Sequence, residues 1–289
     1  MYVRNGIYKE SSTLDLSAMT GLIEIDFHNN NFGNNIYLPL NIQTIKLRGD
    51  MGNQIYFSDG IATSSQILAR DTCFPVALKY VELELCNLNF WQSLRNCTSL
   101  SRIYSWGGNF NSGYLKSLAE IGTNNIKSIS IVSVYSGKGG SISLENLKYQ
   151  PNLTYVELSR FSTVTTADLS SLTKLTSFTL VSSNLLDISF LEECTSLTTL
   201  NLSDNNIVNL YPLRNLKNLT TLYLNTNAIY DTASVVNGEE TIVVKNLEII
   251  SGLHSSNGGK LNSIYLAGNS NILDFSPLSK LSWSNKSGF

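Results

Sequence analysis

The sequence predicts an α/β repeat fold, a solenoid whose coils stack into one parallel β-sheet. Two observations support this prediction. The segments SLTTLNLSDNNI (196–207) and NLTTLYLNTNAI (218–229) align without gaps at an offset of 22 residues. The same pattern, L-x-x-L-x-L-x-x-N-x-L, recurs in ten copies along the chain. One copy cannot bury its apolar side alone, whereas stacked copies enclose a continuous core.

Each copy is expected to contain one short strand. The apolar residues three and five positions after the first leucine are two apart, so they point to one side of a strand. The asparagine follows where the chain turns out of the strand, and its amide can bond backbone groups of neighbouring coils. Pro212 and Pro277 fall on the returning arc, where no sheet ladder needs their N–H groups. The ten copies begin at Leu22, Ile42, Leu78, Leu100, Ile126, Leu153, Leu175, Leu197, Leu219 and Leu261.

Three steps between copies contain insertions, which lie near residues 50–74, 136–141 and 231–259. In the last of these, Val235-Val236 and Thr241–Val244 flank Asn237-Gly238, which predicts a strand–turn–strand hairpin. The following NLEIISGL (246–253) predicts a short helix. Insertions in solenoids leave by the loops, and some of these loops bind partners. The hairpin is therefore either a binding element or a decoration over the convex side.

These repeats resemble the leucine-rich repeat family. The stretch NLSDNNIVNLYPLRNLKNLTTLYLNTNAIYD (201–231) is similar to the 22-residue class of bacterial internalin-like proteins. RNCTSL and EECTSL are similar to a phrase of other bacterial surface leucine-rich repeats. The resemblance covers residues 14–285 and is strongest over 150–278. It implies a right-handed leucine-rich-repeat solenoid with the parallel sheet on its concave face and short helical or irregular segments on the convex side.

The same resemblance implies a single solenoid domain of about ten coils over residues 1–289, and a non-enzymatic protein-binding module that uses the concave face. The chain departs from the internalin pattern in three ways. Its early spacing is irregular, it has no cysteine-rich cap, and no immunoglobulin-like domain follows. A specific internalin activity is therefore not implied.

Composition excludes several classes of partner. With a net charge of −2 and no basic block, the chain lacks the clustered Lys and Arg that nucleic-acid binding needs. No apolar run approaches the ~18–20 residues of a membrane helix, so we expect no membrane insertion.

The start, MYVRNGIYKE, lacks the apolar region of a signal peptide. From the resemblance we expect a protein secreted by a bacterium or displayed on its surface.

No group of acid, base or metal ligands points to an enzyme, a cofactor or a metal. The two histidines, His28 and His254, lie far apart in repeat order, and no His-Glu-x-x-His, Cys-x-x-Cys or nucleophile elbow is present. Asp50, Asn53 and Asp59 offer oxygen ligands in a glycine-containing loop. They lack the full ligand set and bidentate acid of a calcium site, so a plain loop is the favoured interpretation.

Repeat geometry also constrains the cysteines. Cys97 and Cys194 share one repeat position four coils apart, or roughly 20 Å at ~4.8 Å per coil. A disulfide needs Cα atoms closer than ~7 Å, so these two cannot pair. Cys73 lies in an insertion and Cys86 at an asparagine position, and a bridge between them stays open. Buried free thiols are the default expectation.

Register decides which side chains reach the concave surface. Counted from the first leucine of their copy, Ile103, Ser105 and Phe110 point inward. Tyr104 and Trp106 then point outward, and a slip of one residue would reverse every side chain.

Charges and aromatic rings concentrate at the outward positions before residue 160. Cross-strand ion pairs that keep the surface soluble would explain Asp26, Lys46 and Glu82. Exposed tyrosine and tryptophan beside arginine are instead the side chains that dominate protein interfaces. The predicted partner-binding residues are Arg48, Tyr80, Glu82, Glu84, Arg102, Tyr104, Trp106, Tyr155, Glu157 and Tyr223.

Two other functions stay open from the sequence. The chain could be a structural spacer segment of a larger surface protein, because a repeat array normally needs caps and the strand expected after Trp283 is cut short by the terminus. A carbohydrate-binding face built on tyrosine and tryptophan is the other alternative.

Overall fold

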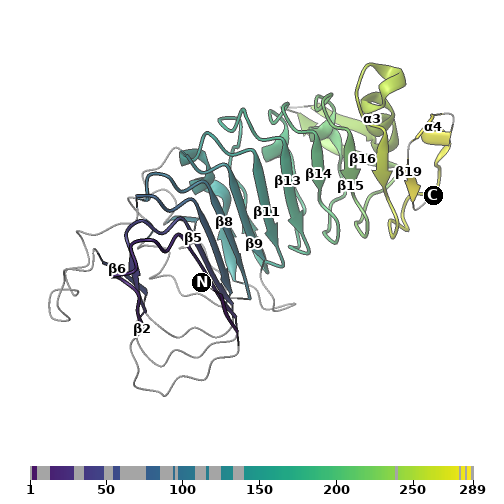
Figure 1. Cartoon of the computed structure of the whole chain (residues 1–289). Coiled ribbons are helices and arrows are strands. Elements are labelled where there is room, and N and C mark those ends of the chain that lie inside the picture. The colour runs from purple at the N-terminus through teal and green to yellow at the C-terminus, as the bar shows by residue number, and fades with distance from the viewer. Residues whose placement is uncertain are drawn as a thin grey trace.

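Twelve parallel strands form one sheet in chain order within the described part of the molecule (Figure 1). The structure is a computed structural model, and it describes residues 2–4, 14–28, 36–48, 55–58, 76–84, 94, 97–107, 115–116, 125–132, 140–237, 240–279, 281–283 and 285–287. The strands of the sheet are β1 (Tyr2–Arg4), β3 (Glu24–His28), β5 (Thr44–Arg48), β7 (Tyr80–Glu84), β8 (Arg102–Trp106), β9 (Ser128–Val132), β11 (Tyr155–Ser159), β13 (Ser177–Val181), β14 (Thr199–Asn201), β15 (Thr221–Tyr223), β18 (Ser263–Tyr265) and β19 (Asn285–Ser287).

Each of the ten predicted copies supplies one strand of this sheet, from β3 to β18, while β1 and β19 add a strand at each end. Strand pairing follows the repeat, since Phe178 pairs with Leu200 and Leu200 with Leu222, each 22 residues further on. The predicted solenoid with a parallel sheet is therefore confirmed. That residues 1–289 form a single domain of about ten coils stays a prediction.

The core fills the inside of the coils with the apolar positions of the repeat. Leu197, Leu200, Leu202 and Ile207 are all fully buried, as their offsets of zero, three, five and ten predict. They belong to one continuous hydrophobic cluster that spans residues 16–278. Because successive coils share this cluster, each coil is stabilised by its neighbours.

In six copies the chain leaves the strand through a left-handed residue. Six copies have a positive φ at the position seven residues after the first leucine. These residues are Gly107 (82°), Arg160 (66°), Ser182 (53°), Asp204 (56°), Thr226 (51°) and Gly268 (77°). Left-handed backbone is costly for any residue except glycine. The geometry of the coil therefore imposes this turn, against the backbone preference of most of these residues.

The asparagine of the repeat binds backbone groups of two coils, as predicted. Asn205 is buried, and its Nδ2 donates to the carbonyl oxygens of Leu180 at 2.7 Å and Leu202 at 3.0 Å. Its Oδ1 accepts from the backbone N–H groups of Ser183 and Leu185, both at 3.0 Å. One amide thus satisfies donors and acceptors that the turn would otherwise leave buried and unpaired.

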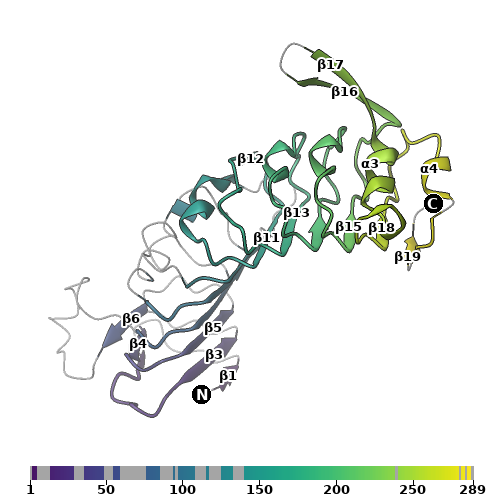
Figure 2. The same ribbon diagram turned by 90° about the horizontal axis from the view of Figure 1, so that it is seen from above.

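Short helices form the convex side in the second half of the chain (Figure 2). Pro212 lies in one of them and Pro277 in another, which confirms their place on the returning arc. These helices are η1 (Leu144–Tyr149), η2 (Ser189–Leu191), η3 (Tyr211–Leu213), α3 (Asn246–Leu253), η4 (Ser255–Asn257) and α4 (Ser276–Ser279). The short parallel strands β10 (Ser141–Ser143) and β12 (Thr163–Thr165) pair beside them.

The first half of the chain has a second parallel sheet that the leucine pattern does not predict. Strands β2 (Leu14–Asp15), β4 (Ile36–Pro39) and β6 (Ile55–Ser58) lie side by side. Strand β6 falls inside the predicted insertion near 50–74, where the run Ile-Tyr-Phe suits a strand because β-branched and aromatic residues favour it. All four residues of β4 are buried, so this sheet closes the core opposite the main one.

The insertion near 231–259 contains the predicted hairpin and helix. Strands β16 (Thr232–Asn237) and β17 (Glu240–Lys245) pair antiparallel, and Asn237 is the last paired residue of β16 and not part of the turn. The helix α3 has the predicted bounds. Figure 2 shows the hairpin projecting from the convex side, away from the main sheet. Of the insertion near 136–141, only its end and the start of β10 lie within the described residues.

Candidate functional site

Strand β8 presents two aromatic rings on the outer face of the sheet. Ile103 and Ser105 are buried, while Tyr104 and Trp106 are half-buried on the opposite face. The predicted register is therefore confirmed for these four residues, and Phe110 lies outside the described residues. The ring centroids of Tyr104 and Trp106 are 4.9 Å apart with an interplanar angle of 32°. The rings lie together because strand residues two apart share a face.

Strand β7 places two glutamates beside these rings. Glu82 pairs in register with Tyr104, and Glu84 with Trp106. The Tyr80 hydroxyl donates to Glu82 Oε2 at 3.0 Å, along the same strand. Glu82 is 7% exposed, so this hydrogen bond holds a largely buried carboxylate. Tyr80 itself pairs in register with the exposed Arg102 of β8.

Strand β11 repeats the tyrosine–glutamate arrangement on the other side of the rings. The Tyr155 hydroxyl donates to Glu157 Oε2 at 2.8 Å, and the Ser130 hydroxyl donates to the same oxygen at 2.7 Å. Burial and the neighbouring Glu157 carboxylate raise the pKa of Tyr155, and the Tyr104 hydroxyl raises it further. The phenol of Tyr155 is therefore neutral at physiological pH and remains a donor. The phrase Tyr-Val-Glu-Leu, present at 80–83 and 155–158, marks both pairs in the sequence.

Eight of the ten predicted binding residues lie together on three strands, β7, β8 and β11, with only β9 between the last two. We call this surface the aromatic–acidic patch, and it comprises Tyr80, Glu82, Glu84, Arg102, Tyr104, Trp106, Tyr155 and Glu157. Arg48 is the last residue of β5, the strand next to β7, and its side chain lies outside the described residues.

Tyr223 lies apart from the patch. It is on β15, and two strands separate it from β11. Its ring stacks on that of Tyr265, with centroids 4.3 Å apart and an interplanar angle of 11°. Burial and the neighbouring Tyr265 raise the pKa of Tyr223. Tyr265 occupies the same offset in the next copy, and this shared offset is the sequence signal that identifies it as the partner ring.

Charges at the N-terminal end of the sheet alternate between strands, as expected if cross-strand charges keep this surface soluble. Lys46 pairs in register with Asp26 on one side and Glu82 on the other. Its Nζ forms an ion pair with Glu24 Oε1 at 2.7 Å. That hydrogen bond raises the pKa of Lys46, and the nearby carboxylates of Asp26 and Glu82 add to the effect. Lys46 therefore balances three acids on the two neighbouring strands, β3 and β7.

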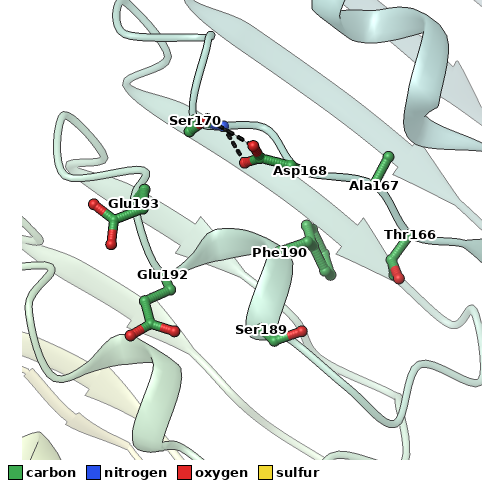
Figure 3. Close-up of a pocket in the computed structure, with 8 residues that line it drawn as sticks. All are labelled: Thr166, Ala167, Asp168, Ser170, Ser189, Phe190, Glu192 and Glu193. Carbon is green, nitrogen blue, oxygen red and sulfur yellow. Dashed lines mark hydrogen bonds between the residues drawn. The ribbon is translucent and has the colours of Figure 1, made fainter.

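A shallow pocket of about 410 Å³ lies away from the sheet (Figure 3). Two of its acidic side chains have structural partners. Asp168 accepts hydrogen bonds from the backbone N–H and the hydroxyl of Ser170, both at 2.8 Å. Glu192 is paired with Arg214. The pocket is lined by Thr166, Ala167, Asp168, Ser170, Ser189, Phe190, Glu192 and Glu193.

The histidine and cysteine side chains that the structure describes are held in the interior. His254 is fully buried, where Nδ1 accepts from the Ser256 N–H at 3.1 Å and Nε2 donates to the Ser282 carbonyl at 2.9 Å. Cys97 and Cys194 are free and buried, as predicted, and burial raises the pKa of each thiol to about 12. The side chain of His28, the proposed Cys73–Cys86 bridge, and the oxygen ligands Asp50, Asn53 and Asp59 lie outside the described residues.

The described residues offer neither a metal site nor a membrane span. They contain no group of three or more His, Cys, Asp or Glu side chains arranged to hold a metal ion. None of their helices is long and apolar enough to cross a membrane.

Comparison with known proteins agrees with this geometry. Residues 195–235 match the family model described as Leucine Rich repeats (2 copies). No curated protein sequence matches the chain.

Several solved structures share the fold at low sequence identity. Internalin C2 of Listeria monocytogenes is 19% identical, with 71% of this chain and 73% of that chain covered and a TM-score of 0.50. The internalin InlF of the same species is also 19% identical, with 94% and 81% covered and a TM-score of 0.52. The plant peptide hormone receptor RGFR1, in complex with RGF2, is 14% identical, with 89% and 38% covered and a TM-score of 0.53. The chain therefore has the leucine-rich-repeat solenoid fold, with an arrangement of strands similar to that of bacterial internalins.

Proposed function

We propose that the chain is a non-enzymatic protein-binding module whose concave sheet face contacts its partner through the aromatic–acidic patch. The observation that carries the proposal is the adjacent pair of half-buried rings, Tyr104 and Trp106, beside the exposed guanidinium of Arg102. Tyrosine, tryptophan and arginine are enriched among the few residues that supply most of the binding energy at protein interfaces. Core packing does not account for these rings, because the core positions of β8 are filled by Ile103 and Ser105.

The organisation of the patch supports the same proposal. Hydrogen bonds from Tyr80 and Tyr155 fix the carboxylates of Glu82 and Glu157 before any partner arrives. Groups that are already ordered lose less conformational entropy on binding. The plant receptor of similar fold is described in complex with RGF2, which provides a precedent for ligand binding by this architecture. From the likeness to bacterial internalins we also propose that this protein acts at a bacterial surface or after secretion.

A peptide-display selection tests the proposal and needs no identified partner. A random peptide library is selected on the full chain and on the Tyr104→Ala/Trp106→Ala double variant. The matched control is Tyr223→Ala/Tyr265→Ala, which removes the other pair of rings on the same face. We expect the wild type and the control to enrich the same peptides, and the patch variant to lose them.

The alternatives give different results in this experiment. A spacer segment would enrich no peptide that depends on either aromatic pair. A carbohydrate-binding face would enrich no such peptide and would bind members of a glycan array through Tyr104 and Trp106.

A further inference from the structure

Glu157 is an oriented carboxylate on the concave face. Its Oε2 accepts two hydrogen bonds, from Tyr155 at 2.8 Å and from Ser130 at 2.7 Å. Both donors are neutral hydroxyls, so they fix the carboxylate in position without neutralising its charge. The side chain is half-buried in the middle of the sheet, and its register neighbours on the two adjacent strands are Ser130 and Thr179.

No basic side chain among the described residues forms an ion pair with Glu157. Four other glutamates of this chain each have one. Those pairs are Glu24 with Lys46, Glu145 with Lys148, Glu192 with Arg214 and Glu248 with Lys245. Arg102, the basic residue of the patch, lies two strands from Glu157 and makes no ion pair with it. The negative charge of Glu157 is therefore balanced by solvent alone in the described part of the molecule.

A partner that covers the aromatic–acidic patch removes that solvent. Burying a charged carboxylate without a compensating charge is strongly unfavourable, and complementary charge across an interface offsets this cost. The surroundings of Glu157 suit a cation in a second way. Tyr155 donates its hydroxyl to Glu157, and Tyr104 pairs in register with Ser130, whose register neighbour on the other side is Glu157, so aromatic residues border the carboxylate. A ring face attracts a lysine ammonium or, more often, an arginine guanidinium.

We propose that the protein partner inserts a lysine or arginine side chain between the rings of Tyr104 and Tyr155, with its charged end bound to Glu157. This inference rests on the proposed function and specifies the chemistry of the partner. It predicts a preference for basic segments, with the hydroxyl of Ser130 and the phenol of Tyr155 keeping the receiving oxygen in place.

The test uses the peptides that the display selection enriches on the full chain. Each peptide is synthesised in two forms, with its Arg and Lys retained, or with citrulline in place of Arg and acetyl-lysine in place of Lys. Affinity is measured by titration calorimetry against wild type, Glu157→Gln and the control Glu248→Gln, which removes one exposed charge on α3. Glutamine keeps an acceptor oxygen for Tyr155 and Ser130, so the variant changes the charge and not the shape.

We expect the neutral peptides to bind wild type about tenfold more weakly than the basic ones. Glu157→Gln should abolish that difference, while Glu248→Gln preserves it.

The inference is overturned if the enriched peptides lack basic residues, or if Glu157→Gln binds basic and neutral forms with the same ratio as wild type. In either event the proposed function stands as long as Tyr104→Ala/Trp106→Ala abolishes binding. If that double variant binds the peptides as well as wild type, the proposed face itself is wrong.

Discussion

Tyr104 and Trp106 lie side by side on the outer face of β8, with their ring centroids 4.9 Å apart. The residue between them, Ser105, points into the core. This alternation places two large rings at the surface of a protein whose repeat reserves the opposite face for apolar side chains. The two rings are consequently at the surface, while the buried positions of this coil are filled by other side chains.

The left-handed turn after β15 gives the first prediction. Thr226 has a φ of 51°, which the Cβ of any residue other than glycine disfavours. We expect Thr226→Gly to raise the free energy of unfolding by about 0.5–1 kcal/mol, measured by urea denaturation. Thr226→Ala retains a Cβ and should gain nothing. Equal effects of the two variants would show that strain at this turn is not the cause.

The asparagine of the repeat gives the second prediction. Asn205→Ala leaves the N–H groups of Ser183 and Leu185 and the carbonyl of Leu180 without their side-chain partner. Because unsatisfied buried groups are costly, the free energy of unfolding should fall by about 3 kcal/mol. The neighbouring Asn206 is exposed, and Asn206→Ala should change stability by less than about 0.5 kcal/mol. Similar losses of unfolding free energy from both variants would contradict the role assigned to Asn205.

The inward position of Ser105 gives the third prediction. Its hydroxyl is buried where the two adjacent copies carry leucine and isoleucine, and it has no hydrogen-bond partner among the described residues. Ser105→Ala should therefore raise the free energy of unfolding by about 1 kcal/mol. Ser130→Ala, which removes a hydroxyl bound to Glu157, should give no such increase. A destabilised Ser105→Ala variant would mean that this hydroxyl is satisfied in solution.

The buried thiols make the free energy of unfolding depend on pH. Burial raises the pKa of Cys97 and Cys194 from an ordinary value of 9.0 to about 12, so folding favours the neutral thiol. The contribution of the neutral thiols to stability is fully present below pH 9 and is lost as the pH rises toward 12. The free energy of unfolding should fall by up to about 1.4 kcal/mol per pH unit for each thiol in this range.

The matched variant for this measurement is Cys97→Ala/Cys194→Ala, compared with wild type by denaturation at several alkaline pH values. Its unfolding free energy should decline less steeply above pH 9 than that of wild type. Identical slopes would contradict the assignment of the effect to these two residues.

Much of the main sheet follows from the sequence because a 22-residue period fixes strand position and register together. The helix at 246–253 and the hairpin before it were also predictable, since turn residues and β-branched runs are local signals. The second sheet was not predictable. Strands β2, β4 and β6 recur outside the leucine pattern, and pairing between short runs depends on contacts distant in sequence.

The candidate site was predictable in its residue types and not in its internal geometry. Alternation places Tyr80, Glu82, Tyr155 and Glu157 on one face, but the hydroxyl–carboxylate bonds depend on side-chain rotamers. Residue type alone groups Tyr223 with these side chains, whereas strand order separates it and pairs it with the tyrosine of the next copy.

The affinity of a display-selected peptide for three forms of the chain decides whether the aromatic–acidic patch binds protein. We predict that Tyr104→Ala/Trp106→Ala binds at least about 30-fold more weakly than wild type, because hot-spot side chains contribute about 2 kcal/mol or more each. Tyr223→Ala/Tyr265→Ala should bind as wild type does. Unchanged affinity of the first variant, with the fold intact by circular dichroism, would contradict the claim that the aromatic–acidic patch is the binding site.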